Sequence, residues 1–427
     1  MKILIVGSGG REHTLTWKLA QSPTVDQIYC APGNGGIAEI ATCVDLSAND
    51  LYGLVDFAER ESIDLTVIGP EAPLVAGIAD LFTARGLPIY GPTQAAARLE
   101  GSKSFTRQLL HKHDIDHIQF EVFTDSSAAK AYVRQQGAPI VVKADGLASG
   151  KGVEVAQTVA EAEAHIDLCL EQGGYGSAGE TVIVEECLVG QECSIKVFTD
   201  GETVVPMVPS QDYKPIGDGD VGPNTGGMGC YSPVPVVDSE VFDYIVNQLI
   251  RPTIEAMATE GSPYVGTLYA GCILTEQGPK LLEYNCRFGD PETQVVLPRL
   301  DGDLFTILQA TVEGRLDEVD IHWKQDRCVC VVLASGGYPR SYETGKPISG
   351  LAQVAGWEDV MIFHAGTSRQ DGQLVTDGGR VLGVTALGKT YRIARERAYQ
   401  AAAIIDFENK YHRTDIAQRA VEAEHSG

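Results

Sequence analysis

The chain has 427 residues, 44% hydrophobic and 21% charged, which is typical of a globular protein with roughly three domains. Its formal net charge of −25 excludes a general nucleic-acid binder, because contacts to phosphate backbones need clustered lysine and arginine. No stretch approaches the roughly 18 apolar residues that span a membrane. We therefore expect neither nucleic acid nor a membrane among its partners.

The ten cysteines form no Cys-x-x-Cys pair, and most lie in apolar stretches, as Cys169, Cys272 and Cys328 do. The apolar start at residues 2–6 is too short for a signal sequence and runs into a glycine turn. We therefore expect a cytoplasmic protein with ten reduced, mostly buried thiols.

The first unit, residues 1–102, alternates apolar strands with helical segments. A helix is expected at residues 11–20, and strands are expected at 2–6, 27–31, 64–68 and 87–90. This alternation predicts a small parallel sheet covered by helices.

The turn Gly7-Ser-Gly-Gly-Arg-Glu12 follows the first strand and is similar to the start of a dinucleotide-binding fingerprint. Glu12 replaces the third glycine of that motif, and residues 29–33 supply no acid after the second strand. An NAD-dependent oxidoreductase is therefore a distant alternative. The turn either serves only the fold or presents its amides to another phosphate at a helix N-terminus.

The pattern changes after a helix expected at residues 102–113, with Ser102 as its cap. Strands at 139–143, 153–155 and 181–185, with a helix at 160–171, predict a small α+β unit with an antiparallel sheet. The central part contains a long helix within 234–260 and a hairpin of 268–274 and 280–287. The last part has a strand at 328–333, short strands between glycine-rich turns, and a helix at 391–405.

A glycine-rich loop, Lys143-Ala-Asp-Gly-Leu-Ala-Ser-Gly-Lys-Gly152, joins two of these strands. Its glycines let backbone amides approach phosphate oxygens, and Lys143 and Lys151 add positive charge. It is not a Walker loop, because the spacing to Lys151 is one residue short and strands flank it on both sides. We predict that it binds phosphates.

Glu283, Asn285 and Arg287 alternate along the second strand of the predicted hairpin and therefore share one face. A carboxylate and an amide oxygen two residues apart suit Mg²⁺, which takes oxygen ligands and bridges nucleotide phosphates. Arg287 can meet a developing acyl phosphate through its fork of donors.

The intervening residues Leu282, Tyr284 and Cys286 are expected in the core. The same pattern fits an amphipathic strand with a solvated polar face, so spacing alone leaves that alternative open. Polar loops favour a site, because ordering them costs conformational entropy. Such loops occupy residues 210–214, 224–229 and 287–294.

In this order, the motifs resemble those of the ATP-grasp superfamily and, within it, the phosphoribosylamine–glycine ligase family, over essentially the whole chain. The segments that carry the match are Gly7–His13, Gly69–Pro73, Lys143–Gly152, Gln211–Gly229 and Arg287–Gln294. Residues 268–271 lack the acidic metal ligand that many carboxylase relatives have there. Residues 114–117 depart from the family, which usually has a proline, and this affects local loop shape.

The resemblance implies a multidomain α/β and α+β protein with the ATP-grasp fold. Its expected parts are a Rossmann-like N-terminal substrate domain (1–102), a central ATP-grasp domain (103–122 and 190–325), a mobile lid (123–189) and a small β-rich C-terminal domain (326–427). The lid would exclude water from a reactive acyl phosphate.

The implied reaction is the ATP-dependent ligation of glycine to 5-phosphoribosylamine, giving glycinamide ribonucleotide, ADP and phosphate through glycyl phosphate in purine biosynthesis. ATP is the implied co-substrate, with Mg²⁺ or Mn²⁺ as the metal. The nearer alternative is another ATP-grasp carboxylate–amine ligase or a purine carboxylase.

Individual roles also follow from the resemblance. The ATP-binding residues would be Lys103, Lys143, Gly146, Ser149, Gly150, Lys151, Gly152, Glu185, Glu186, Leu188 and Glu192. The substrate-binding residues would be Gly9, Gly10, Glu71, Asp212, Lys214, Asn224, Gly226, Gly227, Arg287 and Asp290. Glu283 and Asn285 would hold the metal. The catalytic residues would be Lys143 at the phosphates, Arg287 at the acyl phosphate and Asp212 at an amine.

Overall fold

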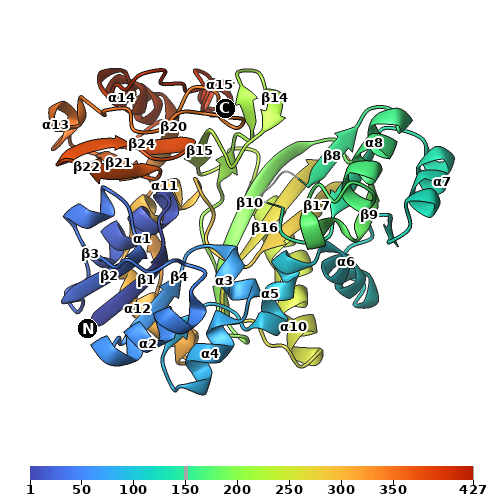
Figure 1. Cartoon of the computed structure of the whole chain (residues 1–427), viewed down its shortest axis with the longest axis horizontal. Coiled ribbons are helices and arrows are strands. Elements are labelled where there is room, and N and C mark those ends of the chain that lie inside the picture. Colours follow the sequence, from blue (N-terminus) through green and yellow to red (C-terminus); the bar gives the residue numbers. More distant parts are fainter. Residues whose placement is uncertain (149–151, 427) are drawn as a thin grey trace.

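The computed structural model describes residues 1–148 and 152–426. Four sheets of four or five strands organise this part of the chain. In Figure 1 the N-terminal sheet lies below the C-terminal sheet at the left, and the unit built around β6–β9 extends to the right.

The N-terminal sheet is parallel, in the order β3-β2-β1-β4-β5, as predicted. Its strands are β1 (Lys2–Gly7), β2 (Gln27–Pro32), β3 (Thr42–Cys43), β4 (Leu65–Ile68) and β5 (Ile89–Tyr90). Its helices are α1 (Gly10–Leu19), α2 (Leu51–Glu61), α3 (Glu71–Val75), α4 (Ile78–Ala84) and α5 (Gln94–Gly101). Residues 3–6 of β1 are completely buried, because helices cover both faces of the sheet.

Helix α6 (Lys103–Lys112) follows, and the Ser102 side chain caps it by accepting from the Phe105 amide at 3.1 Å. The next unit is an antiparallel sheet in the order β6-β9-β7-β8, also as predicted. Its elements are β6 (Phe120–Phe123), α7 (Ser126–Gln136), β7 (Ile140–Ala144), β8 (Val153–Ala156), α8 (Val159–Leu170) and β9 (Val182–Glu186). Val142, Ile166 and Val184 belong to a hydrophobic core that is separate from the other cores.

The central sheet is antiparallel, in the order β11-β10-β16-β17. Its strands are β10 (Gln191–Thr199), β11 (Val204–Pro206), β16 (Gly266–Thr275) and β17 (Gly278–Asn285). The long helix predicted within residues 234–260 is α9 (Ser239–Tyr244), a π-helical segment (Ile245–Ile250) and α10 (Arg251–Thr259) in direct succession. The predicted hairpin is β16–β17.

One irregularity in this hairpin changes a predicted side-chain direction. The register of β16 and β17 shifts just after Gly271, and such a bulge breaks the alternation of the strand. As a result Leu281 is fully buried in the core, whereas Leu282 is half-buried and lines a cavity. The prediction that Leu282 packs in the core is therefore wrong, whereas Tyr284 and Cys286 are buried as expected.

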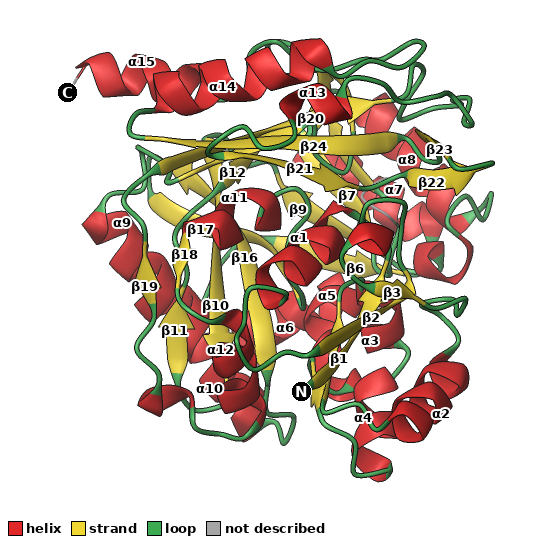
Figure 2. Ribbon diagram, turned by 90° about the vertical axis from the view of Figure 1, so that its left-hand side faces the viewer, coloured by secondary structure: helices red, strands yellow, loops and turns green. Residues whose placement is uncertain are grey.

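The last large sheet has the order β12-β15-β20-β24-β21. Its strands are β12 (Gln211–Asp212), β15 (Gly229–Ser232), β20 (Arg327–Ala334), β21 (Val360–His364) and β24 (Arg380–Gly388). Its helices are α13 (Leu351–Val354), α14 (Tyr391–Ile404) and α15 (Gln418–Ser426); α14 and α15 lie over the sheet at the top of Figure 2. Because β12 and β15 come from residues 190–325, this sheet crosses the domain boundary predicted at residue 325.

Shorter elements complete the described structure. The two-stranded sheets are β13 (Pro215–Gly217) with β14 (Val221–Asn224), β18 (Leu300–Asp301) with β19 (His322–Trp323), and β22 (Thr367–Gln370) with β23 (Gln373–Thr376). Helices α11 (Thr293–Val296) and α12 (Leu304–Val312) follow the central hairpin, and 3₁₀ turns lie at Ile37–Glu39, Gly176–Gly179, Leu297–Arg299 and Leu316–Glu318.

All ten cysteines are free thiols. Eight are buried as expected, Cys187 is half-buried, and Cys43 is exposed because its strand β3 lies at the edge of the N-terminal sheet. Across residues 1–148 and 152–426, no helix combines the length and the apolar character needed to cross a membrane.

Candidate functional site

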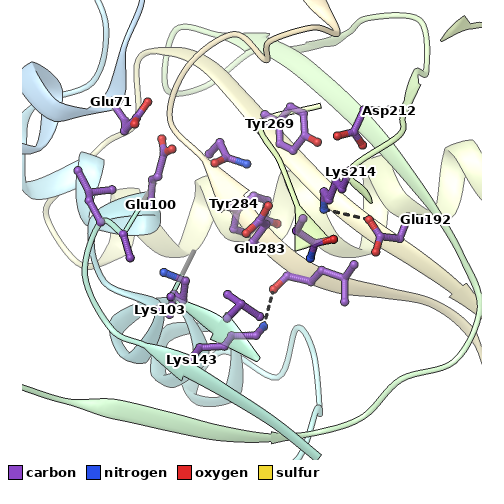
Figure 3. Close-up of a pocket in the computed structure, with 18 of the residues that line it drawn as sticks. Glu71, Glu100, Lys103, Lys143, Glu192, Asp212, Lys214, Tyr269, Glu283 and Tyr284 are labelled. Atoms are coloured by element: carbon purple, nitrogen blue, oxygen red, sulfur yellow. Dashed lines mark hydrogen bonds and ion pairs between the residues drawn. The ribbon is translucent and has the colours of Figure 1, made fainter. Parts of the chain in front are cut away.

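A cavity of about 530 Å³ opens between the N-terminal unit, the β6–β9 unit and the central sheet. Most of the residues predicted from the sequence line it. They are Glu71, Lys103, Lys143, Gly152, Glu185, Glu186, Leu188, Glu192, Asp212, Lys214, Asn224, Gly226, Glu283, Asn285, Arg287 and Asp290. Figure 3 draws 18 of the lining residues as sticks and labels ten of them, and the labelled residues come from all three parts of the chain.

The remaining predicted residues lie elsewhere. Gly9 lines a second cavity of about 300 Å³. Gly10, Gly146 and Gly227 line neither cavity, although the Gly146 carbonyl accepts from Lys103 Nζ at 3.2 Å. The predictions for Ser149, Gly150 and Lys151 fall outside the described residues.

Glu283 lies at the centre of the main cavity, between Lys103 and Lys143 on one side and Lys214 on the other (Figure 3). Burial alone would raise the pKa of this carboxyl, but Lys214, the other two lysines and Arg287 outweigh burial and lower the pKa. An ionised carboxylate surrounded by cations suits a site for a polyanion accompanied by a metal ion.

The donor chemistry of Glu283 and Asn285 fits a hard divalent cation. The Asn285 Oδ1 atom accepts from Arg287 Nη2 at 3.2 Å, which orients the amide oxygen. In the described part of the chain, no group of three or more His, Cys, Asp and Glu side chains could hold a metal ion. Mg²⁺ in proteins is usually held by one or two carboxylates and takes further ligands from substrate phosphates and water.

A buried ionic network forms one wall of the main cavity. Lys143 Nζ lies 2.6 Å from Glu185 Oε2, and Arg107 Nε donates to Glu185 Oε1 at 2.7 Å. Burial would raise the pKa of Glu185, but the two cations lower it to about 2. Arg107 also donates to the carbonyls of Leu281 and Leu282 at 2.9 and 3.0 Å. Helix α6, β7, β9 and β17 therefore meet at a carboxylate that stays ionised.

A second ionic cluster holds Arg287. Its Nε atom donates to Glu71 Oε2 at 3.2 Å, and its Nη2 atom donates to Glu100 Oε1 at 2.9 Å. Glu100 is buried and also accepts from the Cys286 amide at 2.7 Å. Burial raises the pKa of Glu100. Burial acts in the same direction on Glu71, but the charges of Arg287 and Arg11 and the hydrogen bonds together outweigh it and lower the pKa of Glu71. The guanidinium is thus fixed between two carboxyl groups.

A third cluster surrounds Asp212, at the upper right of Figure 3 beside Tyr269 and Lys214. Burial and the neighbouring Glu292 carboxylate raise the pKa of Asp212 to about 7, although Lys214 opposes the shift. Lys214 Nζ donates to Glu192 Oε2 at 2.9 Å and is therefore shared between carboxylates. Asp212 can consequently exchange a proton near neutral pH.

The second cavity lies between the glycine turn after β1 and the C-terminal sheet. Gly9 and Thr367 line it from the two sides. Asp290 and Arg380 line both cavities and so connect them. Arg380 Nη1 lies 3.3 Å from Asp290 Oδ1 and donates to the Gly226 carbonyl at 2.7 Å.

The turn after β1 is not arranged for a dinucleotide. The Gly9 amide donates to Glu12 Oε2 at 2.5 Å, and the Arg11 amide donates to Asp290 Oδ2 at 3.2 Å. A Cβ at Gly69 would lie 1.9 Å from Glu12 Oε1, so the glutamate fills the space beneath the turn. These contacts argue against the NAD-dependent alternative.

Four charged residues of these clusters were not predicted. Glu292 lies inside the polar segment 287–294, so the motif itself could have indicated it. Glu100, Arg107 and Arg380 are single charges within otherwise ordinary helices or an apolar strand, and their sequence neighbourhood carries no signal.

Three family models match consecutive parts of the chain. They are phosphoribosylglycinamide synthetase N domain over residues 1–100, its ATP-grasp (A) domain over residues 101–293, and its C domain over residues 328–419.

Full-length relatives agree with these matches. The phosphoribosylamine–glycine ligase of Vibrio parahaemolyticus is 52% identical, with 99% of each chain covered. The crystal structure of the Thermotoga maritima phosphoribosylamine–glycine ligase is 32% identical and has a TM-score of 0.85, with 97% of this chain and 100% of that chain covered. A more distant structure is the biotin carboxylase domain of Hydrogenobacter thermophilus 2-oxoglutarate carboxylase in complex with MgADP. It is 14% identical and has a TM-score of 0.76, with 96% of this chain and 91% of that chain covered. This is a likeness of fold alone.

Proposed function

The chain belongs to the phosphoribosylglycinamide synthetase family of ATP-grasp ligases, and we infer from this membership that it joins glycine to 5-phosphoribosylamine. The reaction is an ATP-dependent carbon–nitrogen ligation in purine biosynthesis. Its products are glycinamide ribonucleotide, ADP and phosphate.

Two chemical steps give these products. A glycine carboxylate oxygen attacks the γ-phosphorus of ATP, ADP leaves, and glycyl phosphate forms. The amine nitrogen of phosphoribosylamine then attacks the glycyl carbonyl carbon, the carbon–oxygen bond to phosphate breaks, and the nitrogen loses one proton. The protein contributes positioning and charge stabilisation to both steps.

ATP is proposed to lie in the main cavity. Lys103 and Lys143 would meet its phosphates, Glu186 and Leu188 its adenine, and Glu192 its ribose. The placement of these residues around one cavity supports the assignment. Mg²⁺ or Mn²⁺ held by Glu283 and Asn285 would neutralise phosphate charge. The roles of Gly146, Ser149, Gly150, Lys151 and Gly152 in phosphate binding stay predictions.

Arg287 is proposed to meet the acyl phosphate. Its guanidinium is already fixed by Glu71 and Glu100, so it needs no reorganisation as charge develops. Asp212 is proposed to bind the amine, and its pKa of about 7 supports this role, since a carboxyl group with a pKa near the working pH can take up and release a proton.

The phosphate end of phosphoribosylamine is proposed to occupy the second cavity, with its amine directed into the main cavity. Asp290 and Arg380 support this placement because they line both spaces, and Arg380 supplies a cation. The candidate residues for this substrate are Gly9, Gly10, Asn224, Gly226 and Gly227.

Residues 123–189 are proposed to act as a lid over glycyl phosphate. Their separate hydrophobic core supports this role, because a unit with its own core can move as a body. The cytoplasm is the proposed location, which ten free thiols support.

The observation that carries the function is full-length family membership together with a cavity in which Glu283 is surrounded by four cations. The test is phosphate release from Mg·ATP with glycine and freshly made phosphoribosylamine, with each omitted in turn. Phosphate that requires both, matched mole for mole by glycinamide ribonucleotide, is expected. Release that does not depend on glycine, in protein that binds ATP, would overturn the proposal.

A further inference from the structure

An exposed hairpin begins and ends in the wall of the main cavity. Strands β13 and β14 (residues 215–224) leave the cavity at Lys214 and return to it at Asn224. The two ends are joined because the Lys214 carbonyl accepts from both the amide and the hydroxyl of Thr225, each at 2.8 Å. We call residues 214 and 224–226 the hairpin base.

One buried cation, Arg413, attaches the hairpin to the C-terminal segment, by which we mean residues 411–419. Arg413 has no exposed surface. Its Nη1 atom donates to the Pro215 carbonyl at 3.0 Å, and its Nη2 atom lies 3.0 Å from Asp220 Oδ1. The guanidinium also binds both carboxylate oxygens of Asp415, at 2.7 and 2.6 Å, and lies 4.6 Å from the Tyr213 ring centroid.

Further contacts between the hairpin and the C-terminal segment surround Arg413. The Gly219 amide donates to Asp415 Oδ2 at 2.9 Å, and the Thr414 amide donates to Asp218 Oδ1 at 2.8 Å. Arg419 pairs with Asp220 from helix α15. In Figure 1 β14 accordingly lies beside α15, although the two are about 200 residues apart in the chain.

A two-stranded hairpin is only marginally stable alone in water. Strand β14 is exposed along its whole length, so the hairpin has little apolar surface of its own with which to fix its direction. The contacts to residues 411–419 therefore fix the direction of the hairpin, and the Tyr411 hydroxyl adds to them by donating to the Ile216 carbonyl at 2.9 Å. Arg380 and the Tyr338 hydroxyl hold the hairpin base at Gly226. Because Tyr213 lies between Asp212 and Lys214, the Arg413 contact to its ring also fixes two side chains of the cavity wall.

We propose that Arg413 is a positioning residue for the ligase reaction, which acts through the hairpin base to hold Lys214 and Asn224 against phosphoribosylamine. This inference rests on the proposed function. A lysine cannot replace Arg413, because the planar guanidinium contacts Asp415, Asp220 and the Pro215 carbonyl at the same time. The ammonium group of a lysine is a single point charge without this planar set of donors.

The chain supplies a matched control for this proposal. Arg395 braces the same C-terminal segment by donating to the carbonyls of Ile416 at 2.9 Å and Thr414 at 2.6 Å, but it is attached to helix α14 and not to the hairpin. Arg395→Met should therefore remove an arginine that contacts the same segment while every contact between the segment and the hairpin stays in place.

The experiment measures kcat and KM for each substrate, with thermal unfolding, in Arg413→Met, Arg413→Lys and Arg395→Met. We expect both Arg413 variants to raise the KM of phosphoribosylamine about tenfold, with the KM of ATP within about twofold. Arg395→Met should match the wild type in both constants. An equal KM for phosphoribosylamine in folded Arg413→Met and Arg395→Met would overturn the proposal.

A milder variant guards against loss of folding. Asp220→Asn removes the charge that pairs with Arg413 and Arg419, at a partly exposed side chain, and leaves the Arg413–Asp415 pair intact. We expect about a threefold higher KM for phosphoribosylamine, and an unchanged KM would count against the proposal. Glycine dependence of the wild type is measured first, so failure of the function itself is recognised before any variant is compared.

Discussion

Glu185 and Asp212 line the same cavity, yet their carboxyl groups titrate in opposite directions from the ordinary value. Desolvation acts on both, but Glu185 is in direct contact with Lys143 and Arg107, and its pKa falls to about 2. Asp212 faces the carboxylate of Glu292, and its pKa rises to about 7. Because burial raises the pKa of both groups, the difference between them comes from the neighbouring charges, which outweigh burial at Glu185 and add to it at Asp212.

The two regions thereby suit different tasks. The region around Glu185 holds a carboxylate that stays ionised at all physiological pH values and fixes Lys143 and Arg107 beside the proposed nucleotide site. The region around Asp212 can gain or lose a proton near pH 7, which suits a step in which an amine becomes an amide. Substitutions at each region test this contrast.

Glu185→Gln should have the largest effect on stability. It removes the carboxylate that pairs with buried Lys143 and Arg107 and leaves Arg107 only the more distant Asp116 carboxylate, 3.8 Å away, so we expect a loss of about 3–5 kcal/mol at pH 7. Since the pKa of folded Glu185 lies below its unfolded value, its stabilisation is present above about pH 4.5 and is lost as the pH falls toward 2. Urea unfolding at pH 7, 5, 4 and 3 should show the difference from wild type shrinking.

The matched control is Glu186→Gln, one residue along the same strand, where the side chain is exposed. Its stability should stay within about 0.5 kcal/mol of wild type. A Glu185→Gln deficit that does not change between pH 7 and 3 would contradict the assigned charge state.

Lys143→Met should reduce kcat by about 10²–10³-fold, because a preorganised cation is removed from the transferring phosphoryl group. Lys280→Met is the control: Lys280 lies 3.6 Å from Asp116 behind the same network but does not line the cavity. Its kcat should match the wild type. Steady-state kinetics with saturating Mg·ATP measures kcat for both variants. An equal loss of kcat in the two would show that Lys143 acts only through the ionic network.

The stability of Asp212→Asn relative to wild type should rise with pH, whereas that of Glu185→Gln should fall with pH. The raised pKa means that protonated Asp212 stabilises the fold below about pH 4, and this contribution is lost as the pH rises through about 7. Relative to wild type, the free energy of unfolding of the variant should gain up to about 4 kcal/mol between pH 4 and pH 8. Urea unfolding across this range measures the gain, and a constant difference would refute the raised pKa.

Lys214→Gln should have the smallest effect on stability, below about 1 kcal/mol, since its pair with Glu192 is partly exposed. It should, however, raise the pKa of Asp212 further from that of Glu185, because Lys214 lowers the pKa of Asp212. The stability gain from Asp212→Asn should level off near pH 7, the folded pKa of Asp212, and this plateau should begin at a higher pH in the Lys214→Gln background. A plateau that begins at the same pH in both backgrounds would show that Lys214 does not interact with Asp212.

Predictions from local pattern succeeded where the cause is local. Ser102 was predicted as a helix cap because a cap needs only a hydroxyl before a helical segment, and it accepts from the Phe105 amide. Glu283 and Asn285 were predicted to share a face because strand alternation is local, and both line the cavity. Leu282 was predicted wrongly because the bulge near Gly271 depends on the partner strand.

The sequence by itself determined the fold class, the family and most of the residues that line the cavity, since strand periodicity, glycine turns and contiguous motifs are written in neighbouring residues. Only the tertiary structure decided which charges meet. Glu100 reaches Arg287, Arg107 reaches Glu185, and Arg413 reaches Asp220 across separations that no local motif spans. The reason is physical, because Coulomb interactions and desolvation depend on distance in space and not along the chain.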